Sequence, residues 1–572
     1  MANVMSLKQL QNKVKRNGFD LSFKNAFTAK VGELLPIMCK EVYPGDKFNI
    51  KGQAFTRTQP VNSAAYSRLR EYYDFYFVPY RLLWNLAPTF FTNMPDFHHA
   101  KSLTTSSSVV TRHPYFTYSD IMEYLGNLNT TAGVNEKYQK NFFGFSRVEL
   151  TVKLLNYLNY GFADNYADIV VPSDANNIVL SPWPLLAYQK ICQDYFRDDQ
   201  WQQGEPYRYN LDYLTTSGDY HIPIGDLSQA DFKNPTMFDL NYCNYQKDYF
   251  TGMLPRAQYG DVAVASPLVG DLAIEHGSSL SFQSTPATGS NTISAGVLTL
   301  AGKDMTTAGL SVLALRQAEC LQKWREIAQS GKQDYQTQMQ KHFNVSPSDA
   351  MSDHCKYLGG WNSNLNINEV VNTNLTGDAQ ADIQGKGVGT LNGDSIDFDA
   401  KEHGVIMCIY HCMPLLDWSI TRIARQNMKT SFTDYAIPEF DSIGMQQLYP
   451  NEMIFGLSDL PSDPSTINMG YVPRYADLKT SVDEIHGAFI DTLISWVSPL
   501  TESYLSAYRQ ACIDSGLSDI QMTYHFFKVN PHIVDNIFGV NADSTINTDQ
   551  LLINSFFDIK AVRNFDFNGL PY

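Results

Sequence analysis

Charged residues are scarce in this chain of 572 residues. Asp, Glu, Lys and Arg together make up 18% of it, whereas a soluble globular protein contains about 25%. Long apolar runs are missing as well: no stretch reaches the ~18 residues of a membrane-spanning helix, and basic residues interrupt every apolar stretch near the N-terminus. The sequence therefore predicts a protein without a membrane span and without a secretory signal.

Cysteines are few, and the common catalytic patterns are absent. Eight cysteines without a CxxC pair are too few for a disulfide scaffold, so we expect reduced thiols and a protein made and kept in a cytoplasm. Walker A, HExxH, GxSxG and Rossmann patterns are also missing. The glycine-rich run 385–389 follows Asn-rich sequence and is interpreted as a loop or hairpin. The residues thus indicate no catalytic residue and no cofactor.

Two clusters have the residue types of metal ligands without the spacing. Cys408, His411 and Cys412 offer the sulfur and imidazole that zinc prefers. In a strand, however, residues 408 and 412 share one face and 411 lies on the other, so the three do not converge. The three aspartates within 394–399 lack the order of acids of a calcium loop and are interpreted as a solvated turn. We predict no metal site.

Aromatic residues, by contrast, are plentiful. Phe, Tyr and Trp make up 13% of the chain. So many rings favour an ordered chain over a disordered one. Abundant rings and few charges are also typical of a protein that buries much of its surface against neighbours.

Basic charge is concentrated at the N-terminus. Residues 1–30 hold six bases and one acid, a net charge of +5, and since the whole chain carries -16, residues 31–572 carry -21. One interpretation is a solvated, loose terminus, as chain ends commonly are. The other is an arm that contacts phosphates.

Strand patterns occur at both ends of the chain. Residues 46–58 and 72–78 are short, rich in aromatic residues and bounded by turn signals, and 403–416 is apolar on both alternating faces, as in a strand covered on both sides. Near the C-terminus, Leu551 to Ala561 alternate between apolar and polar side chains, and 521–529 is predicted to form the strand before it.

Helices are fewer, and long segments show no helical period. Apolar stripes at helical spacing run from Ala314 to Ala328 and from Val148 to Leu158, where Gly161 provides a C-cap signal. Residues 281–310 are rich in Gly, Ser, Thr and Ala, and 361–400 are rich in Asn and Gly. Such stretches are typical of functional loops, β excursions or disordered segments. The pattern indicates one β domain elaborated by insertions.

Several motifs along the chain resemble those of the major capsid protein of microviruses, small icosahedral phages with single-stranded DNA, and most closely those of the gokushovirus-like branch and its relatives in gut bacteria. They occur in the order and at the approximate spacing of that family, over nearly the whole chain. The motifs are FDLS (19–22), GELLPI (32–37), the PGD turn (44–46), YYDFYFVPYRLLW (72–84), PLLAYQKICQDYFRDD (184–199), DYFTGMLPRAQYGDV (248–262), LRQAECLQKW (315–324), EHGVIM (402–407), GYVPRYADLK (470–479) and FFDIKAVRNFDFNGLPY (556–572).

The resemblance implies a mainly β fold, a viral jelly roll of eight antiparallel strands with long inserted loops and a few helices. We accordingly expect a basic N-terminal arm over residues 1–30 and a single elaborated jelly-roll domain over 31–572, with inserted excursions at about 126–181, 263–312 and 361–400. It also implies a structural protein without catalytic residues, which assembles with copies of itself into a small icosahedral shell around a circular single-stranded DNA genome.

The resemblance also bears on the site residues. In a shell the arm is repeated by symmetry and faces the genome, so Lys8, Lys13, Lys15 and Arg16 are predicted to contact phosphates without reading bases. Residues 263–312 are expected on the exterior, where they contribute to host attachment. The partners implied are the packaged DNA, a host surface receptor and other virion proteins (pilot, small basic DNA-binding and scaffolding proteins).

A second class of function fits the aromatic content. A secreted jelly-roll glycosidase or carbohydrate-binding protein would use Tyr and Trp to line a sugar cleft. Such a protein requires export, and no signal sequence and no lipid-attachment cysteine before Cys39 is present.

Overall fold

The strands of this protein assemble into one curved antiparallel sheet. A computed structural model describes most of the chain. The described residues are 16–63, 65–66, 68–92, 110, 112–129, 136–163, 165–175, 178–214, 220–224, 233–258, 312–329, 331, 335–344, 352–371, 383–418, 422–453, 469–517 and 520–567. The strands are β1 (Asn17–Asp20), β2 (Phe23–Ala29), β3 (Leu35–Val42), β4 (Lys47–Thr58), β5 (Leu69–Pro79), β6 (Phe116–Thr117), β7 (Val179–Leu180), β8 (Lys356–Val371), β9 (Ile383–Asp399), β10 (Gly404–Pro414), β11 (Met445–Leu448), β12 (Gly470–Pro473) and β13 (Leu551–Arg563).

The strand order is that of a jelly roll. Four strands pair in the order β2-β13-β4-β9 and four more in the order β3-β10-β5-β8. Counted along the chain from β2, these two sets are strands 1-8-3-6 and 2-7-4-5, which is the double Greek key. The short strand β1 extends the first set by pairing with the far end of β13.

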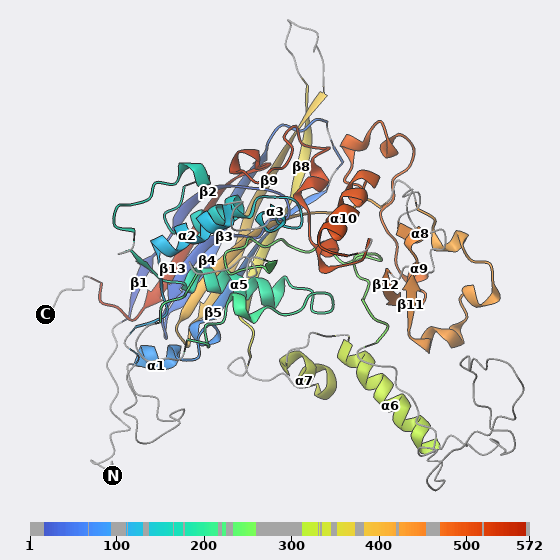
Figure 1. Cartoon of the computed structure of the whole chain (residues 1–572), viewed down its shortest axis with the longest axis horizontal. Helices are drawn as coiled ribbons and strands as arrows, with labels where there is room; N and C mark the ends of the chain where they lie inside the picture. Colours follow the sequence, from blue (N-terminus) through green and yellow to red (C-terminus); the bar gives the residue numbers. More distant parts are fainter. Residues whose placement is uncertain are drawn as a thin grey trace, which may run out of the picture. The chain divides into compact units, whose positions relative to one another are not determined.

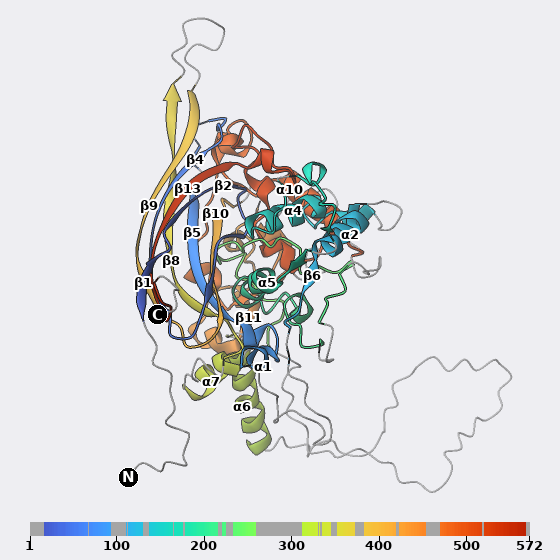
Figure 2. The same ribbon diagram turned by 90° about the vertical axis from the view of Figure 1, so that its left-hand side faces the viewer.

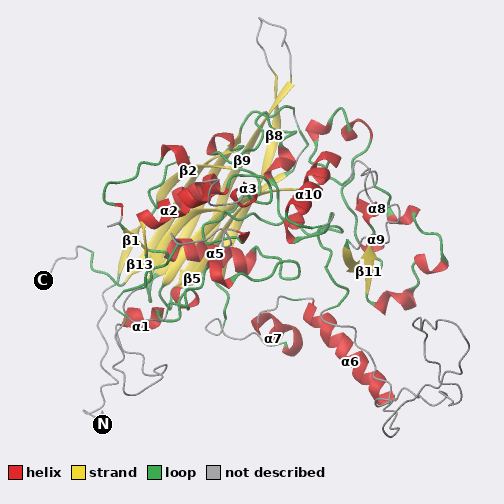
Figure 3. Cartoon of the chain, in the orientation of Figure 1, coloured by secondary structure: helices red, strands yellow, loops and turns green. Residues whose placement is uncertain are grey.

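β8 joins the two four-stranded sets into the continuous sheet seen in Figures 1 and 3. Its first part, up to Leu365, pairs with β5, whereas its last part, from Asn366, pairs with β9. The strand therefore crosses from one set to the other. The sequence-based prediction of a mainly β jelly roll with few helices is confirmed.

The predicted strands 46–58, 72–78, 403–416 and 551–561 correspond to β4, β5, β10 and β13. All eleven residues of β10 are buried, because strands lie on both of its edges and side chains cover both of its faces. In β13, the alternate residues from Leu551 to Ala561 are buried, and the residues between them, including Phe556, are exposed or half-buried. Hydrophobic alternation thus identified both β13 and its inward face.

Aromatic side chains fill the space between the two sets of strands. The Phe75 ring lies 4.8 Å from Trp361 and 6.2 Å from Phe557, measured between centroids. The Phe27 and Tyr410 rings, from opposite sets, lie 5.1 Å apart. Edge-to-face pairs of this kind add to the burial of the rings themselves.

The helices α2, α4 and α5 lie on the β3-β10-β5 side of the sheet, as Figure 2 shows. α5 packs on β10 and β5, and α4 packs on β3. Eight of the eleven residues of α4 are buried, and the predicted stripe from Val148 to Leu158 is confirmed because its members are all buried. The left-handed residue directly after the C-cap is Asn159 rather than Gly161. The helices are α1 (Ala87–Thr92), α2 (Tyr118–Asn129), α3 (Glu136–Gln139), α4 (Arg147–Tyr157), α5 (Trp183–Tyr195), α6 (Val312–Gln329), α7 (Tyr335–Phe343), α8 (Pro450–Met453), α9 (Ala476–Lys479) and α10 (Glu502–Asp514).

Three sequence-based expectations were wrong in whole or in part. Residues 521–529 form a short 3-10 helix (Tyr524–Phe527) instead of a strand, because both Phe526 and Phe527 are buried on a single tight turn. Residues 361–400 are not an inserted excursion: they contain most of β8 and all of β9, with the aspartates of 394–399 in a strand rather than a turn. The basic segment 1–30 is not an arm throughout, since β1 and β2 occupy 17–29.

The described residues divide into two compact units, one up to Ala257 and from Ser352 onward, the other from Gln258 to Met351. In the second unit, α6 confirms the predicted helix. Leu321 and Trp324 of its apolar stripe are nevertheless 44% and 53% exposed. The Trp324 ring stacks on His342 of α7, 5.4 Å away. The expected excursion 263–312 lies outside the described residues except for Val312.

Candidate functional site

The predicted phosphate-binding residues are at the N-terminal border of the described chain. Lys8, Lys13 and Lys15 lie outside the described residues. Arg16 is exposed, and its Nε donates a 3.2 Å hydrogen bond to the Asn564 side chain, just beyond β13. The structure therefore brings none of the four candidates into a common described site.

Two further bases of the N-terminal segment differ in environment. Lys24 of β2 is exposed on the outer face of the sheet. Lys30, immediately after β2, is buried, and its Nζ lies 2.6 Å from Asp549 Oδ1. Lys30 therefore belongs to the interior of the domain and is not available to a ligand.

Lys30 is part of a buried ionic cluster of four residues. Lys153 Nζ, on α4, lies 2.6 Å from Glu33 Oε2 and 2.9 Å from Asp549 Oδ1, and all four side chains are at most 1% exposed. Burial opposes the charge of Asp549, but the lysine charges outweigh it and lower the pKa of Asp549. The cluster connects β2, α4 and the start of β13, so it holds helix and sheet in place rather than binding a ligand.

The cluster Cys408, His411 and Cys412 lies within β10, as the sequence predicted. Cys408 and Cys412 are fully buried, and burial raises the pKa of both thiols. The His411 ring stacks on Tyr72 at 4.9 Å between centroids. No group of three metal-ligating side chains occurs among the residues that the structure describes.

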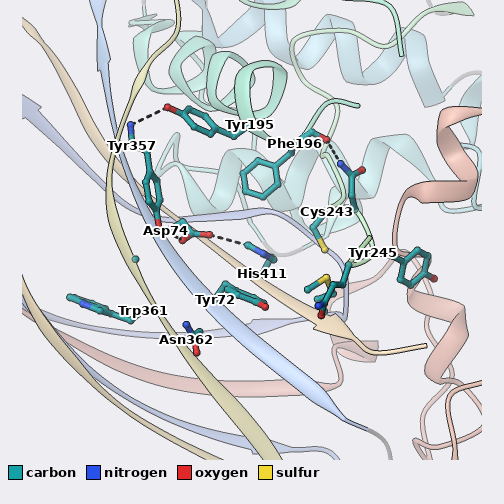
Figure 4. A pocket seen from close by; sticks show the side chains of 14 residues that line it. Tyr72, Asp74, Tyr195, Phe196, Cys243, Tyr245, Tyr357, Trp361, Asn362 and His411 are labelled. Atoms are coloured by element: carbon teal, nitrogen blue, oxygen red, sulfur yellow. Dashed lines mark hydrogen bonds and ion pairs between the residues drawn. The ribbon is translucent and has the colours of Figure 1, made fainter. Parts of the chain in front are cut away.

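A pocket of about 410 Å³ lies beside His411, between β5, β8, β10 and the chain that follows α5 (Figure 4). Figure 4 shows Asp74 between Tyr357 and His411. The Tyr357 hydroxyl donates a 3.0 Å hydrogen bond to Asp74, and His411 Nδ1 is 3.9 Å from the same carboxylate. The pocket is lined by Tyr72, Asp74, Tyr195, Phe196, Cys243, Asn244, Tyr245, Gln246, Tyr357, Gly360, Trp361, Asn362, His411 and Met413.

Asp74, His411 and Cys243 of this pocket are desolvated. Burial raises the pKa of Asp74 to about 6, with the Tyr357 hydrogen bond acting in the opposite direction. Burial lowers the pKa of His411 to about 3, so the imidazole is neutral at pH 7. The thiol of Cys243 is also protonated, because burial raises its pKa to about 12. The pocket thus combines rings and amides for binding with no activated nucleophile among these groups.

Large apolar side chains are exposed at several places in the main unit. Val170, Phe432, Leu478 and Phe567 are between 60% and 83% exposed. Exposed rings and aliphatic chains are favourable contacts for other protein surfaces. No described helix has the length and apolar character to cross a membrane.

Comparison with known proteins identifies the family. A family model described as capsid protein (F protein) matches residues 8–146 and 159–571. The chain belongs to this capsid protein family. It is similar to the capsid protein VP1 of Chlamydia phage 1, with 24% identity over 84% of this chain and 86% of that protein. It is also similar to the capsid protein VP1 of Bdellovibrio phage phiMH2K, with 24% identity over 83% of this chain and 82% of that protein.

The family settles the class of function. The capsid protein is a structural protein of microviruses and not an enzyme, and it forms a homo-oligomeric shell in the virion. The resemblance inferred from the motifs is confirmed. The secreted carbohydrate-active alternative has no support in these comparisons, which match capsid proteins over most of the chain.

Sequence reasoning missed the buried ionic cluster. Lys153 lies on α4 outside the apolar stripe of residues 148, 152, 155 and 158, where a charged side chain is ordinarily solvated, so the helical pattern gave no signal of a buried partner. Its partners Glu33 and Asp549 are far apart in the sequence, so no local pattern points to them.

Proposed function

We propose that this capsid protein assembles into a T=1 icosahedral shell, with one copy in each asymmetric unit, that encloses a circular single-stranded DNA genome. The observation that carries the proposal is the match to the capsid family over nearly the whole chain, together with a jelly-roll sheet. One copy per asymmetric unit requires a single chain to make contacts at every kind of symmetry axis. The low charge, abundant rings and exposed apolar side chains of this chain are suited to contacts between copies.

The N-terminal segment before β1 is proposed to contact the genome. Residues 1–16 contain the four bases Lys8, Lys13, Lys15 and Arg16 and no acid. Symmetry repeats this charge many times over the inner wall, so modest attraction per chain becomes a strong multivalent field. The net acidic charge of the remainder of the chain suits an outer capsid surface that does not bind nucleic acid.

Neutralising the four bases tests the arm. The variant Lys8→Gln, Lys13→Gln, Lys15→Gln, Arg16→Gln should assemble but retain less DNA per particle, and the loss should grow with salt. A control variant with four exposed lysines changed to Gln (Lys140, Lys233, Lys247 and Lys401) alters the net charge nearly equally outside the arm. DNA content unchanged in the arm variant at all salt concentrations would refute this role.

Residues 263–312 are proposed to lie on the exterior and to contribute to host attachment. Deleting them should leave particle yield intact and reduce adsorption to host cells, and loss of particles would count against the idea.

Assembly in the host cytoplasm is proposed as well, and all eight cysteines, which lie within the described residues, are free thiols. Pilot, scaffolding and small DNA-binding proteins are the partners proposed for the finished virion.

A further inference from the structure

The outer face of the β2-β13-β4-β9 set has no helix over it in the described part of the chain, whereas α2, α4 and α5 lie on the opposite side of the sheet (Figure 2). On β4 this face consists of every second residue, from Lys47 to Arg57, all of them exposed or half-buried. Because residues paired across antiparallel strands share a face, the register shows which side chains lie beside one another there.

Three successive rows of side chains cross this face. One row contains Lys24, Phe556, Gln53 and Asn392, the next Ala26, Asn554, Phe55 and Thr390, and the third Thr28, Leu552, Arg57 and Val388. Lys386, two residues before Val388 on β9, is exposed as well. We call the surface made by Lys24, Phe55, Arg57, Lys386 and Phe556, with the polar side chains between them, the basic sheet face.

The charge of the basic sheet face has one sign. Lys24, Arg57 and Lys386 are its ionisable side chains, and no carboxylate occurs in the three rows. The other end of the same sheet is different, because Lys47 pairs with Asp399 at 2.9 Å and Lys560 pairs with Asp20 at 2.7 Å. In a chain of net charge -16, three cations without an opposing acid make a local site for an anion.

The two rings of the basic sheet face are open to solvent. Phe55 and Phe556 are 36% and 46% exposed. They stand in adjacent rows on neighbouring strands, a diagonal for which the Cα separation is about 7–8 Å. The Arg57 guanidinium lies 5.1 Å from the centroid of the Phe55 ring. Exposed rings beside cations are what unpaired bases stack upon in proteins that bind single strands.

A polar hollow adjoins the rings. It has a volume of about 620 Å³ and opens where β8 leaves β5 and passes to β9. Thr390 and Asn392 belong both to this hollow and to the rows that contain Phe55 and Phe556. Four asparagines contribute to its lining, and their amides can donate to and accept from the edges of bases. The lining residues are Asn362, Ser363, Asn364, Asn366, Val388, Thr390, Leu391 and Asn392.

We propose that the basic sheet face binds single-stranded DNA, with bases stacked on Phe55 and Phe556 and phosphates contacting Lys24, Arg57 and Lys386. This inference rests on the proposed enclosure of a single-stranded genome and adds a second contact, separate from the arm. Exposed rings select unpaired bases over a duplex, whose bases are already stacked. A second copy of the chain is the less favourable occupant, because protein interfaces are depleted of lysine, and two of the three cations are Lys24 and Lys386.

Binding of a fluorescent oligothymidylate by the full-length chain, followed by anisotropy at several salt concentrations, tests the site. Phe55→Ala with Phe556→Ala should weaken binding by about fivefold or more per ring with the salt dependence unchanged, and Phe55→Tyr with Phe556→Tyr should bind like the wild type. Lys24→Ala with Arg57→Ala and Lys386→Ala should lower the slope of log Kobs against log salt by about 2. The control Lys47→Ala with Lys560→Ala removes cations that are paired on the same sheet, and should leave the slope nearly unchanged.

A second measurement does not depend on the folding of any variant. Wild-type particles grown with bromodeoxyuridine in their DNA are irradiated, and the cross-linked peptides are identified by mass spectrometry. Cross-links on the peptides that carry Phe55 or Phe556 support the proposal. Three results would overturn it: cross-links confined to other parts of the chain, oligothymidylate binding that is unaffected by loss of the rings, or a clear preference for oligouridylate.

The arm variant described above separates the two proposals. If the arm variant keeps its genome while the ring variant loses oligothymidylate binding, the arm proposal fails and the basic sheet face stands. If the ring variant binds normally but no longer forms particles, the face is a contact between copies, and this inference fails while the capsid function remains.

Discussion

The buried ionic cluster of Lys30, Glu33, Lys153 and Asp549 supports the sharpest stability prediction. Replacing Lys153 with Met keeps the length of the side chain and removes its charge. Glu33 then loses its contact at 2.6 Å and keeps one hydrogen bond, from the Lys30 backbone N–H at 3.0 Å, while its Oε1 has no hydrogen-bond partner even in the wild type. Leaving a buried charge without its partner costs about 3–5 kcal/mol, a large part of the ~5–15 kcal/mol that stabilises a folded domain.

Urea unfolding of the unassembled subunit, followed by tryptophan fluorescence and far-ultraviolet circular dichroism, measures this cost. The control Lys247→Met removes a lysine that is 67% exposed and 3.5 Å from Asp198, a surface pair for which about 0–1 kcal/mol is expected. Adding Glu33→Gln to Lys153→Met should restore part of the loss, because the orphaned charge is gone. A loss below about 1 kcal/mol for Lys153→Met would refute the claim that the cluster is held by mutual charge compensation.

The same cluster predicts how the stability difference between wild type and Lys153→Met depends on pH. The lysines lower the pKa of Asp549 in the folded state, so its contribution is present above its usual unfolded pKa of about 3.9 and is lost as pH falls through the folded pKa. Lys153→Met removes part of this contribution. The stability difference between wild type and variant should therefore narrow on acidification below about pH 4, and a difference that is constant with pH would contradict the assignment.

Three further predictions concern the stability of the folded chain. Glu71 accepts hydrogen bonds from Thr56 (2.8 Å) and Tyr410 (2.7 Å), and burial raises its pKa, so ionising Glu71 above its usual pKa lowers the free energy of unfolding. Glu71→Gln should therefore become more stable to urea relative to wild type as pH rises from 4 to 8. A stability difference that does not change with pH would disprove this. Gly52→Ala should lower the stability by about 1–3 kcal/mol, because its Cβ would lie 2.3 Å from the Trp361 ring. Gly126→Ala on α2 should raise the stability by about 0.5–1 kcal/mol, because no atom lies within 4 Å of its Cβ. Calorimetry that finds stability changes of the same sign for both variants would contradict this prediction. Thr501→Ala should cost about 1 kcal/mol, because the Thr501 side chain accepts a 3.1 Å hydrogen bond from the Tyr504 N–H at the start of α10, and Thr501→Ser should keep most of it in the same urea assay.

Composition misled the prediction for residues 361–400 because glycine has a packing role there. A Cβ at Gly385, Gly387 or Gly389 would lie 2.3–2.7 Å from Ser63, Thr58 or Leu365. These glycines let β9 approach its neighbours closely, whereas in a sequence read alone they resemble a loop. The contacts come from residues more than 300 positions away or from the hairpin partner, so local composition could not distinguish a tightly packed strand from a loop.

The candidate site was predictable only in part. Net charge along the chain pointed to the basic segment 1–30, which contains Lys24 as well as Lys8, Lys13, Lys15 and Arg16, but it gave no indication of Arg57 and Lys386, which lie far along the sequence. The alternation in β13 did place Asn554 and Phe556 away from the core. Which side chains stand beside them depends on the register with β4, and register is a property of the folded sheet.

What the amino-acid sequence determined by itself is the local pattern: the strand β4, the alternation of β13, the buried run of β10, the helices α4 and α6, and the ordered motifs of a capsid family. Each depends on neighbours within a few residues, or on resemblance along the chain. The tertiary structure decided the rest. Long-range pairing turned an Asn- and Gly-rich segment into two strands and closed a charge cluster from Lys30 to Asp549. It also gathered rings and cations from separate strands on one face, because those contacts form only when distant segments pair.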